Sequence, residues 1–268
     1  MIGEKTLELI LYLRLIALFV SFAYASVSDI KSREVSNWVW MILAPIGLAL
    51  TASEYFLSPQ TFPALPTLIS IAIVSILSLV LFFIGFVGGA DAKAFVSIAL
   101  TMPLYPTELT PLLGATFLLF PISVLTNSIL FSALSAPFML LWNLLRKLRG
   151  ERLFQFFDGE SGWRKFLTLL TCVQMDIISI NPSSKISFAE NLVANEKGIR
   201  ERKLRPMYRI AEDDTIEGDL KTYRDLGVTG KIWVTPLLPM MVFITLGIIC
   251  GLFVGDILLM GVGGLIPL

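Results

Sequence analysis

Long apolar runs constrain this chain more than any other feature of its sequence. A helix rises about 1.5 Å per residue and the hydrocarbon core of a bilayer is about 30 Å thick, so a span needs roughly 20 residues. Hydrophobic residues make up 55% of the 268 residues and charged residues only 16%, below the roughly 25% that is usual in a soluble domain. The sequence therefore predicts a mainly α-helical, polytopic membrane helix bundle.

Six runs are candidate membrane spans. The third is the cleanest, and the fourth is so short that we expect neighbouring helices to wrap it. Arg14 interrupts the first run, and its long side chain can extend to the outer interface. The fifth run is longer than a span needs, which predicts a re-entrant or interfacial lead-in before Pro121. The six runs are Leu9–Ser28, Trp38–Ser53, Pro66–Val87, Ala92–Leu104, Pro111–Leu145 and Ile232–Val254.

A densely charged segment separates the fifth run from the sixth. Residues 147–230 contain 14 Lys/Arg and 13 Asp/Glu, and this length is enough for a small soluble domain. Gln174–Ile180 and Lys185–Phe188 are strand-like with a turn between them, and Trp163–Cys172 fits an amphipathic helix on the membrane surface. We expect an α+β insert at 147–230, between spans one to five in residues 1–146 and span six with its tail in 231–268.

Positive charges predict the orientation in the membrane. Placing Lys31, Arg33 and Lys93 on the same side as the insert puts 19 of the 21 Lys/Arg residues there. Positively charged loops stay in the cytoplasm. The sequence thus predicts a multi-pass cell-membrane protein with the insert, the Asp29 loop and the Asp91 loop in the cytoplasm, and both termini outside.

Missing residue types exclude several kinds of chemistry. The chain contains no histidine, which excludes the HExxH metalloproteases and the Ser-His and Cys-His hydrolases. Cys172 and Cys250 lie far apart and form no CxxC pair, so neither a zinc site nor a disulfide framework is expected. The net charge is zero, which gives no basic field for a nucleic acid. We expect no metal and no cofactor.

Two aspartates are the candidate catalytic residues. Asp29 directly follows the first span and Asp91 opens the fourth, so the predicted topology brings both to the cytoplasmic edge. An ionised carboxylate can take a proton from water while a protonated one donates to an amide carbonyl. Gly88 and Gly89 allow a sharp turn and close approach of a substrate. The simpler interpretation is a tight turn in which Asp91 caps the fourth helix.

Other functions remain open at this point. A small membrane transporter or channel would use Asp29 and Asp91 as cation or proton sites, although both lie at one face and no inverted repeat is visible. A Ser-Lys hydrolase would need Lys31 or Lys93 beside Ser28 or Ser36, and nothing in the sequence positions such a pair. A scaffold that binds partners through its insert is a third possibility.

Two short motifs carry a resemblance to a known family. Asp29, Lys31, Arg33, Val35 and Asn37 resemble the D-x-K-x-R-x-[IV]-x-N segment of the prepilin peptidases, and residues 88–93, Gly-Gly-Ala-Asp-Ala-Lys, resemble a G-x-G-D-x-K turn. Both motifs are typical of the GxGD intramembrane aspartyl proteases. The late insert and the closing segment from Trp233 to Pro239 are most similar to archaeal preflagellin peptidases, so the resemblance covers nearly the whole chain.

This resemblance implies an aspartic endopeptidase that removes the short basic leader of a preflagellin or type IV pilin-like precursor. Asp29 and Asp91 would be catalytic, with Gly88, Gly89, Ala90 and Lys93 in the adjoining loop. The partners would be the precursor and membrane lipid; no oligomeric state is implied.

The chain departs from the family pattern in two places. Ala90 replaces the family's second glycine and tolerates a positive φ poorly. The chain also lacks the CxxC pairs that accompany N-methyltransferase activity in bacterial prepilin peptidases, so we expect cleavage without methylation. Pro236 and Pro239 resemble loosely the proline-containing docking motif of presenilins, although a helix start explains them equally well.

Overall fold

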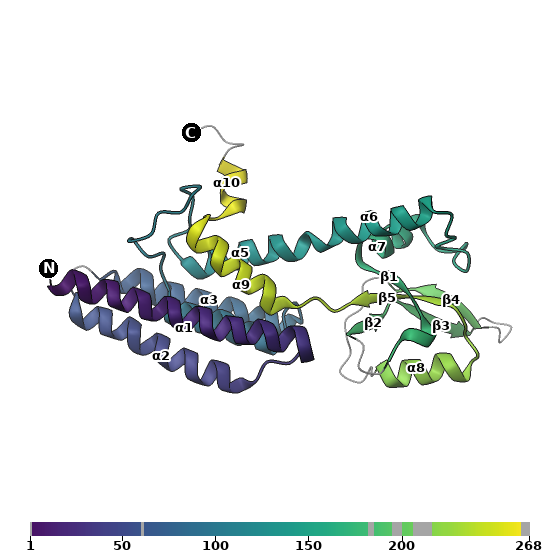
Figure 1. The fold of residues 1–268 in the computed structure, drawn as a ribbon, viewed down its shortest axis with the longest axis horizontal. Coiled ribbons are helices and arrows are strands. Elements are labelled where there is room, and N and C mark those ends of the chain that lie inside the picture. Colours follow the sequence, from purple (N-terminus) through teal and green to yellow (C-terminus); the bar gives the residue numbers. More distant parts are fainter. Residues whose placement is uncertain (1, 60–61, 182–184, 195–199, 206–215, 264–268) are drawn as a thin grey trace. The chain divides into compact units, whose positions relative to one another are not determined.

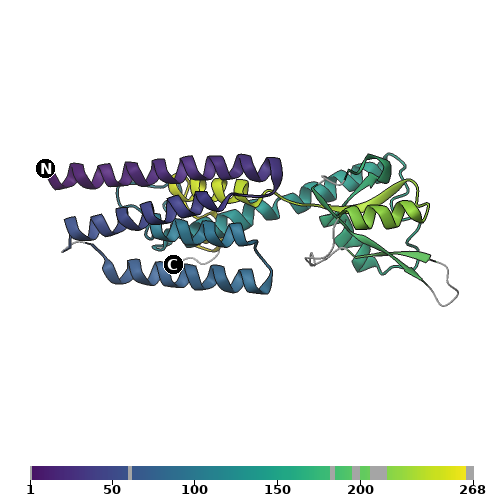
Figure 2. The same ribbon diagram turned by 90° about the horizontal axis from the view of Figure 1, so that it is seen from below.

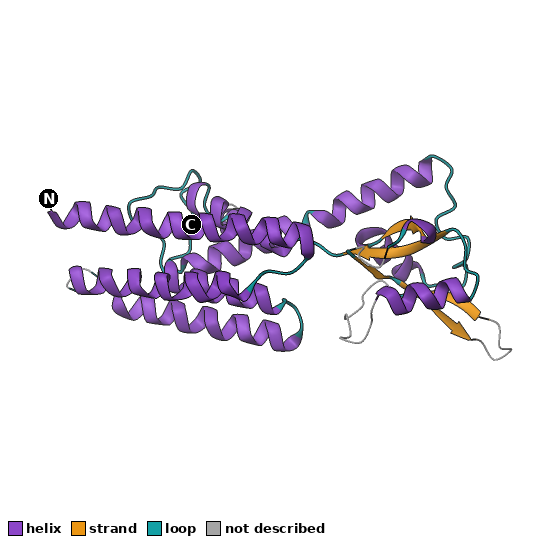
Figure 3. Ribbon diagram, turned by 60° about the horizontal axis from the view of Figure 1, so that its bottom comes forward, coloured by secondary structure: helices purple, strands orange, loops and turns teal. Residues whose placement is uncertain are grey.

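The computed structural model describes residues 2–59, 62–181, 185–194, 200–205 and 216–263. The chain divides into two compact units, one of residues 1–132 and 239–268 and the other of residues 133–238. The first unit is helical, and all strands belong to the second (Figure 3).

Four long helical segments confirm that this is a mainly helical membrane protein. Each is long and apolar enough to cross a bilayer: Lys5–Ser32, Asn37–Leu57, Ala64–Ile84 and Phe120–Leu148. They correspond to α1 (Ile2–Ser32), α2 (Asn37–Leu57), α3 (Ala64–Ile84), and α5 (Phe120–Ala133) followed by α6 (Ser135–Leu148). The segment just before Phe120, where a lead-in was predicted, consists of turns and irregular backbone.

The other two predicted spans are shorter helices. The fourth is α4 (Gly89–Thr101), which ends just before Pro103, a residue that disfavours helix in the residue before it. As expected for a helix too short to span alone, α4 is covered by its neighbours: it packs against α2, α3 and α1. Helix α1 also packs against α2 and α9 (Figures 1 and 2).

The sixth span begins later than predicted. Lys231–Pro236 form strand β5, and the helix α9 covers Met240–Phe253. Alternating residues in 231–236 suit a strand, and Pro236 and Pro239 prevent a helix from starting upstream. A last short helix, α10 (Ile257–Gly263), follows.

Polar side chains join the apolar helices of the first unit. Arg14 is buried and pairs with Glu54, near the C-terminal end of α2, at 2.7 Å and with the Thr51 hydroxyl at 3.1 Å. Removing a charge from water is costly, so the pair with Glu54 explains how Arg14 is accommodated among apolar helices. The Thr51 hydroxyl donates onward to the Leu100 carbonyl and so ties α2 to α4.

Asp256 is a further buried carboxylate in this unit. It is 0% exposed, accepts a hydrogen bond from the Thr126 hydroxyl at 2.6 Å, and caps α10 by accepting from the Leu259 amide at 2.7 Å. Its partners account for its burial, and its role is structural.

In the residues that the structure describes, the second unit contains two small sheets, the helices α6, α7 and α8, and one 3-10 helix. Its larger sheet has the order β1-β5-β2, all antiparallel, with β1 at Val173–Asp176 and β2 at Ile186–Phe188. The two predicted strands therefore exist in part but do not form a hairpin, since β5 lies between them; residues 182–184 of the predicted turn lie outside the described residues. The rest comprises α7 (Gly162–Thr171), the 3-10 helix Ile177–Ser179, β3 (Glu190–Ala194), β4 (Arg200–Leu204) and α8 (Ile216–Asp225).

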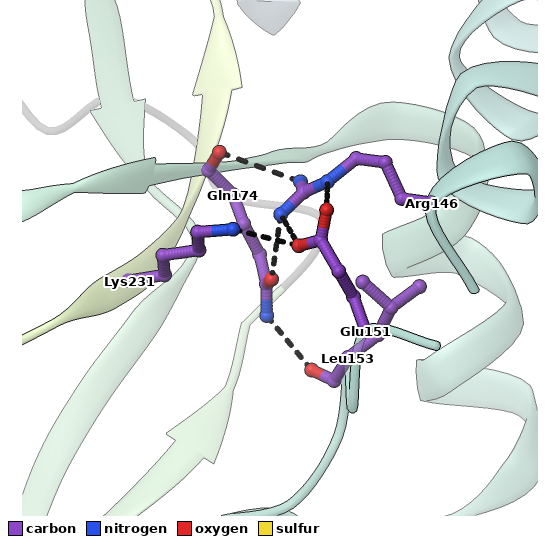
Figure 4. A network of polar contacts seen from close by, with 5 residues as sticks. All are labelled: Arg146, Glu151, Leu153, Gln174 and Lys231. Atoms are coloured by element: carbon purple, nitrogen blue, oxygen red, sulfur yellow. Dashed lines mark hydrogen bonds and ion pairs between the residues drawn. The ribbon is translucent and has the colours of Figure 1, made fainter. Parts of the chain in front are cut away.

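A charged network joins α6 to the larger sheet (Figure 4). Arg146 donates to both carboxylate oxygens of Glu151, at 3.2 and 2.6 Å, and to the Gln174 side chain at 3.2 Å, while Lys231 donates to Glu151 at 2.6 Å. The hydrogen bonds from Arg146 and Lys231 lower the pKa of Glu151 to about 2. This carboxylate stays charged, and the network stays intact, at any neutral pH.

Close packing of α2 against α4 leads to the first prediction. A Cβ on Gly47 would lie 2.7 Å from the Thr101 Cα, so Gly47→Ala must push the two helices apart. We expect a loss of about 1–3 kcal/mol of stability, measured as a lower unfolding temperature in detergent.

Gly261→Ala is the matched control for this substitution. Position 261 is helical and open, with no atom within 4 Å of the added Cβ, so the alanine should leave stability unchanged or raise it by up to about 1 kcal/mol. Equal stability of both variants would contradict the close contact of α2 with α4.

Candidate active site

Asp29 lies inside a helix and not in a loop. The helix α1 continues to Ser32, four residues beyond the predicted end of the first span, and places Asp29 in its last turn. The side chain is buried, with 8% of the residue exposed, and its Oδ2 accepts a hydrogen bond from the Met241 amide at 3.0 Å. Met241 is the second residue of α9, so Asp29 binds the N-terminal end of another helix, where unpaired N–H groups favour a negative charge.

Asp91 is the third residue of α4. It is buried, with 9% exposed, and its Oδ2 accepts from the Gly88 amide at 3.0 Å in a capping arrangement. Asp91 is therefore not the N-cap that the simpler interpretation predicted: Gly88 is the N-cap, and Asp91 binds its amide from inside the first turn. A capping role does not exclude a chemical one, because the hydrogen bond occupies only one carboxylate oxygen.

The two glycines before Asp91 do not adopt the unusual backbone angles that the sequence suggested. Neither Gly88 nor Gly89 has a positive φ, and Gly88 has ordinary extended angles. Gly88 is needed for space instead, since a Cβ there would lie 3.2 Å from the Asp91 Oδ2. Ala90 also has no positive φ and sits within the helix, so the replacement of glycine by alanine costs no backbone strain.

The structure brings the two aspartates together. Their helices α1 and α4 are in contact, and Asp29 is among the charges that act on Asp91. Both groups are buried and each accepts a hydrogen bond from a backbone N–H. Two neighbouring carboxylates in a site of low dielectric do not both ionise cheaply, so the pair favours one charged and one protonated member.

Arg33 was not predicted as a site residue and is the most unusual one. Its φ of 60° is the one positive value among the non-glycine residues that the structure describes, and such backbone strain is concentrated at functional sites. Its Nη1 lies 3.9 Å from the Asp29 Oδ1. Within the described part of the chain, its Nε and Nη1 are buried and make no hydrogen bond. The basic residues of the first motif could have suggested a cation beside Asp29, but they do not show which of them points inward.

The remaining predicted residues divide between the two units. Lys93 is exposed and donates to the Asn37 side chain at 2.7 Å. Pro239 is the N-cap of α9, two residues before the amide that binds Asp29. Pro236 ends β5 in the second unit, paired with Ile186, and is not brought to Asp29 by any contact of the described residues.

A Ser-Lys arrangement finds no support. Ser28 donates to the Glu34 carbonyl at 2.7 Å, Ser36 caps α2 through the Trp38 amide, and Lys93 contacts Asn37. Among the described residues, no three His, Cys, Asp or Glu side chains gather as a group that could hold a metal ion. What the site can do is acid–base chemistry with two carboxylates.

Two buried carboxylates in a unit of apolar helices are groups that could serve a hydrolase. Comparison with known proteins supports a peptidase. Residues 16–142 match the type IV leader peptidase family, and residues 164–257 match the family described as archaeal peptidase A24 C-terminus type II. Over most of its length the chain is therefore similar to type IV leader peptidases, which supports a protease.

Curated relatives point in the same direction. The chain is 26% identical to a preflagellin peptidase of Methanococcus voltae over 87% of its own length and 91% of that protein's. It is also 26% identical to one of Methanococcus maripaludis, over 87% and 90%, and 24% identical to one of Methanocaldococcus jannaschii, over 88% and 92%.

The contact at Gly88 leads to the second prediction. Gly88→Ala places a methyl group 3.2 Å from the Asp91 Oδ2, so the carboxylate must shift by a few tenths of an ångström. Small displacements of reacting groups cost up to about 100-fold in rate, and we expect peptidase activity to fall at least about 10-fold in a protein that remains folded.

Gly162→Ala serves as the control, since a Cβ at that helical position meets no atom within 4 Å. Unchanged activity in Gly88→Ala would show that the close approach does not matter for Asp91.

Proposed function

We propose that this protein is an aspartic endopeptidase that removes the leader peptide of a preflagellin or a related type IV pilin-like precursor. The observation that carries the proposal is the buried pair of Asp29 and Asp91, each held by a backbone amide. The curated relatives named as preflagellin peptidases support the choice of substrate.

We assign the base to Asp29 and the acid to Asp91. Asp29 binds the N-terminus of α9 through the Met241 amide, and its Oδ1 lies 3.9 Å from the guanidinium of Arg33. Asp91 accepts from the amide of Gly88, the N-cap of its own helix, and has no such cation in the contacts of the described residues. In this assignment the shared proton belongs to Asp91.

The reaction then follows in two steps. Asp29 takes a proton from water as the water oxygen bonds to the scissile carbonyl carbon, and Asp91 gives its proton to the carbonyl oxygen. In the gem-diol that results, the C–N bond breaks as Asp29 passes its proton to the leaving nitrogen. Asp91 recovers a proton from a hydroxyl, which leaves a carboxylic acid, an amine and the starting form of the pair.

Arg33 fits a place beside this pair. Its Nε and Nη1 are buried and make no hydrogen bond in the free enzyme, so a carbonyl oxygen of the substrate can accept from them. These hydrogen bonds to a bound peptide would offset the free-energy cost of burying the two donors.

The proposal includes an orientation in the membrane. Six spans, with α4 and α9 as the short ones, place Asp29, Asp91 and the charged insert at the cytoplasmic face, where 19 of the 21 Lys/Arg residues would lie. A basic leader suits an acidic pair at that face. Cleavage would proceed without metal, cofactor or N-methylation.

Replacing either aspartate by asparagine is the decisive test. The asparagine oxygen still accepts from Met241 or Gly88, so Asp29→Asn and Asp91→Asn should fold. We expect leader removal from a co-expressed archaeal preflagellin to fall by at least about 100-fold in each variant, the loss typical of a missing acid or base, and to be insensitive to EDTA in the native protein.

Asp256→Asn is the matched control, because it changes a third buried carboxylate whose partners are the Thr126 hydroxyl and the Leu259 amide. Its cleavage rate should stay near that of the native protein. Rapid cleavage by Asp29→Asn or Asp91→Asn would refute the pair, and cation or proton flux in liposomes without any proteolysis would favour a transporter.

A separate test concerns Arg33. We expect Arg33→Gln to lower kcat by about 10-fold or more, since it removes both the positive neighbour of Asp29 and the free donors. Arg33→Lys restores the charge but not the planar donors, so it should recover only part of kcat. Equal kcat in all three proteins would exclude a role for Arg33, and equal losses in both variants would indicate that only the guanidinium geometry matters.

A further inference from the structure

Helix α7, which corresponds to the amphipathic helix predicted at Trp163–Cys172, turns an apolar face outward. Trp163 is 66% exposed and Phe166 43%, and their ring centroids lie 5.7 Å apart. A helix at the surface of a soluble domain presents polar residues to water, so this face is unlike that of a water-exposed helix. The face consists of four residues at the spacing i, i+3, i+4 and i+7: Trp163, Phe166, Leu167 and Leu170.

The opposite face of α7 holds the helix to the rest of the second unit. Thr168 and Cys172 are 0% exposed. Leu169 packs against the buried cluster that contains Cys172 and Trp233. Because these contacts fix the rotation of the helix about its axis, the face that contains Trp163 points away from the core of the unit.

Helix α6 binds α7 directly and also exposes an apolar face. The two helices pack against each other (Figure 1). The buried Asn143 side chain donates to the Leu169 and Cys172 carbonyls at 3.0 and 2.8 Å, at the end of α7 where the last carbonyls have no partner within the helix. The side of α6 away from Asn143 is exposed and consists of Phe138, Leu141, Trp142, Leu145 and Leu148. Helix α7 is thus attached to a helix whose free face is suited to lipid.

The length of the candidate span indicates the depth of α7. The segment Phe120–Leu148 has 29 residues, whereas roughly 20 are enough to cross the hydrocarbon core. The surplus of about two turns lets the C-terminal end of α6 extend into the headgroup region, and Asn143 lies in those last turns. Tryptophan is enriched at this depth, where an aromatic ring meets both headgroups and acyl chains.

The connection between the two helices carries positive charge. Residues 146–165 contain six Lys/Arg and three Asp/Glu, and Lys147, Arg149 and Arg152 are exposed. Basic clusters directly after a membrane span are attracted to anionic lipid headgroups. The charge beside α7 therefore complements an anionic bilayer.

We propose that α7 lies in the headgroup region of the membrane, with Trp163 and Phe166 inserted between lipids. Anionic headgroups bind Lys147, Arg149 and Arg152, so the partner of this surface is an anionic lipid bilayer. The charged insert is then held at the membrane surface by α7. The proposal does not depend on the peptidase function, and a second copy of this chain is the competing occupant of the face.

A spin label at position 166 tests where this face lies. Full-length Phe166→Cys is labelled with a nitroxide and reconstituted into vesicles of phosphatidylglycerol and phosphatidylcholine. Cys172 and Cys250 are buried, and native protein treated with the same reagent gives the background. Oxygen concentrates in the bilayer and a nickel chelate stays in water, so we expect oxygen to reach the label more readily. Trp163→Cys is the second position, used in case Phe166→Cys does not fold, and should give the same result.

Ile178→Cys is the reference position. Ile178 is apolar and 80% exposed in the same unit, but it belongs to the 3-10 helix Ile177–Ser179 and not to α7. The nickel chelate should reach its label more readily than oxygen does. Equal nickel access at positions 166 and 178 would overturn the proposal. Low access of both reagents at position 166, with spin–spin broadening that disappears when unlabelled protein is added, would assign the face to a second copy and overturn it as well.

Removal of charge tests the headgroup chemistry. The label at position 166 is measured again after Lys147→Gln and Arg149→Gln are added. Each basic residue near an anionic surface favours binding by about 5-fold, so the ratio of oxygen to nickel access should fall by at least about 5-fold in vesicles that contain phosphatidylglycerol. In phosphatidylcholine alone the ratio should not change.

Lys221→Gln with Arg224→Gln is the control for this substitution, since it removes two exposed charges from α8 in the same unit. This variant should have the ratio of the protein with the label alone in both kinds of vesicle. A ratio that is independent of phosphatidylglycerol in every variant would refute the binding of anionic headgroups.

Discussion

One hydrogen bond connects the two ends of the chain and organises the candidate site. The Asp29 carboxylate accepts from the Met241 amide, 212 residues later, and so joins the last turn of α1 to the first turn of α9. Nearby, the Ser26 hydroxyl contacts Thr245 at 2.8 Å and reinforces the same helix pair. Apolar helices gain little from hydrophobic contact inside a membrane, so polar contacts of this kind determine which helices pair. The group proposed to act on substrate is thus also part of what holds the bundle together.

The long helices could be predicted from the sequence because the thickness of a bilayer sets their length, and the fourth run, predicted at 92–104, corresponds to α4 at Gly89–Thr101. Their ends were less predictable. Helix α1 continues through Lys31, since hydropathy detects the apolar stretch but not the charged turn that extends it. Strand β5 was assigned to the sixth span because Ile232–Val234 is apolar, and only its pairing with β1 and β2, both distant in sequence, distinguishes it from a helix.

The candidate site was predictable in its acids but not in its surroundings. Two aspartates at the same predicted membrane edge were visible as residues after and before apolar runs. The hydrogen bond from the Met241 amide and the position of Arg33 beside Asp29 depend on how α1, α4 and α9 pack, and no local pattern encodes that packing. Gly88 is an example. The sequence suggested an unusual backbone angle there, whereas in the structure its backbone angles are ordinary and its lack of a Cβ leaves room for the Asp91 carboxylate.

The backbone amides that bind the two aspartates make the two oxygens of each carboxylate different. Each carboxylate has its Oδ2 bound to a backbone amide, Asp29 to Met241 and Asp91 to Gly88, while the Oδ1 of Asp29 is the oxygen nearest to Arg33. A free carboxylate has two equivalent oxygens, but here they differ. The surroundings of the two carboxylates are also unlike, with a guanidinium beside Asp29 and the first turn of α4 beside Asp91. A peptide has its own polarity from N- to C-terminus, and surroundings that differ in this way would distinguish its two orientations.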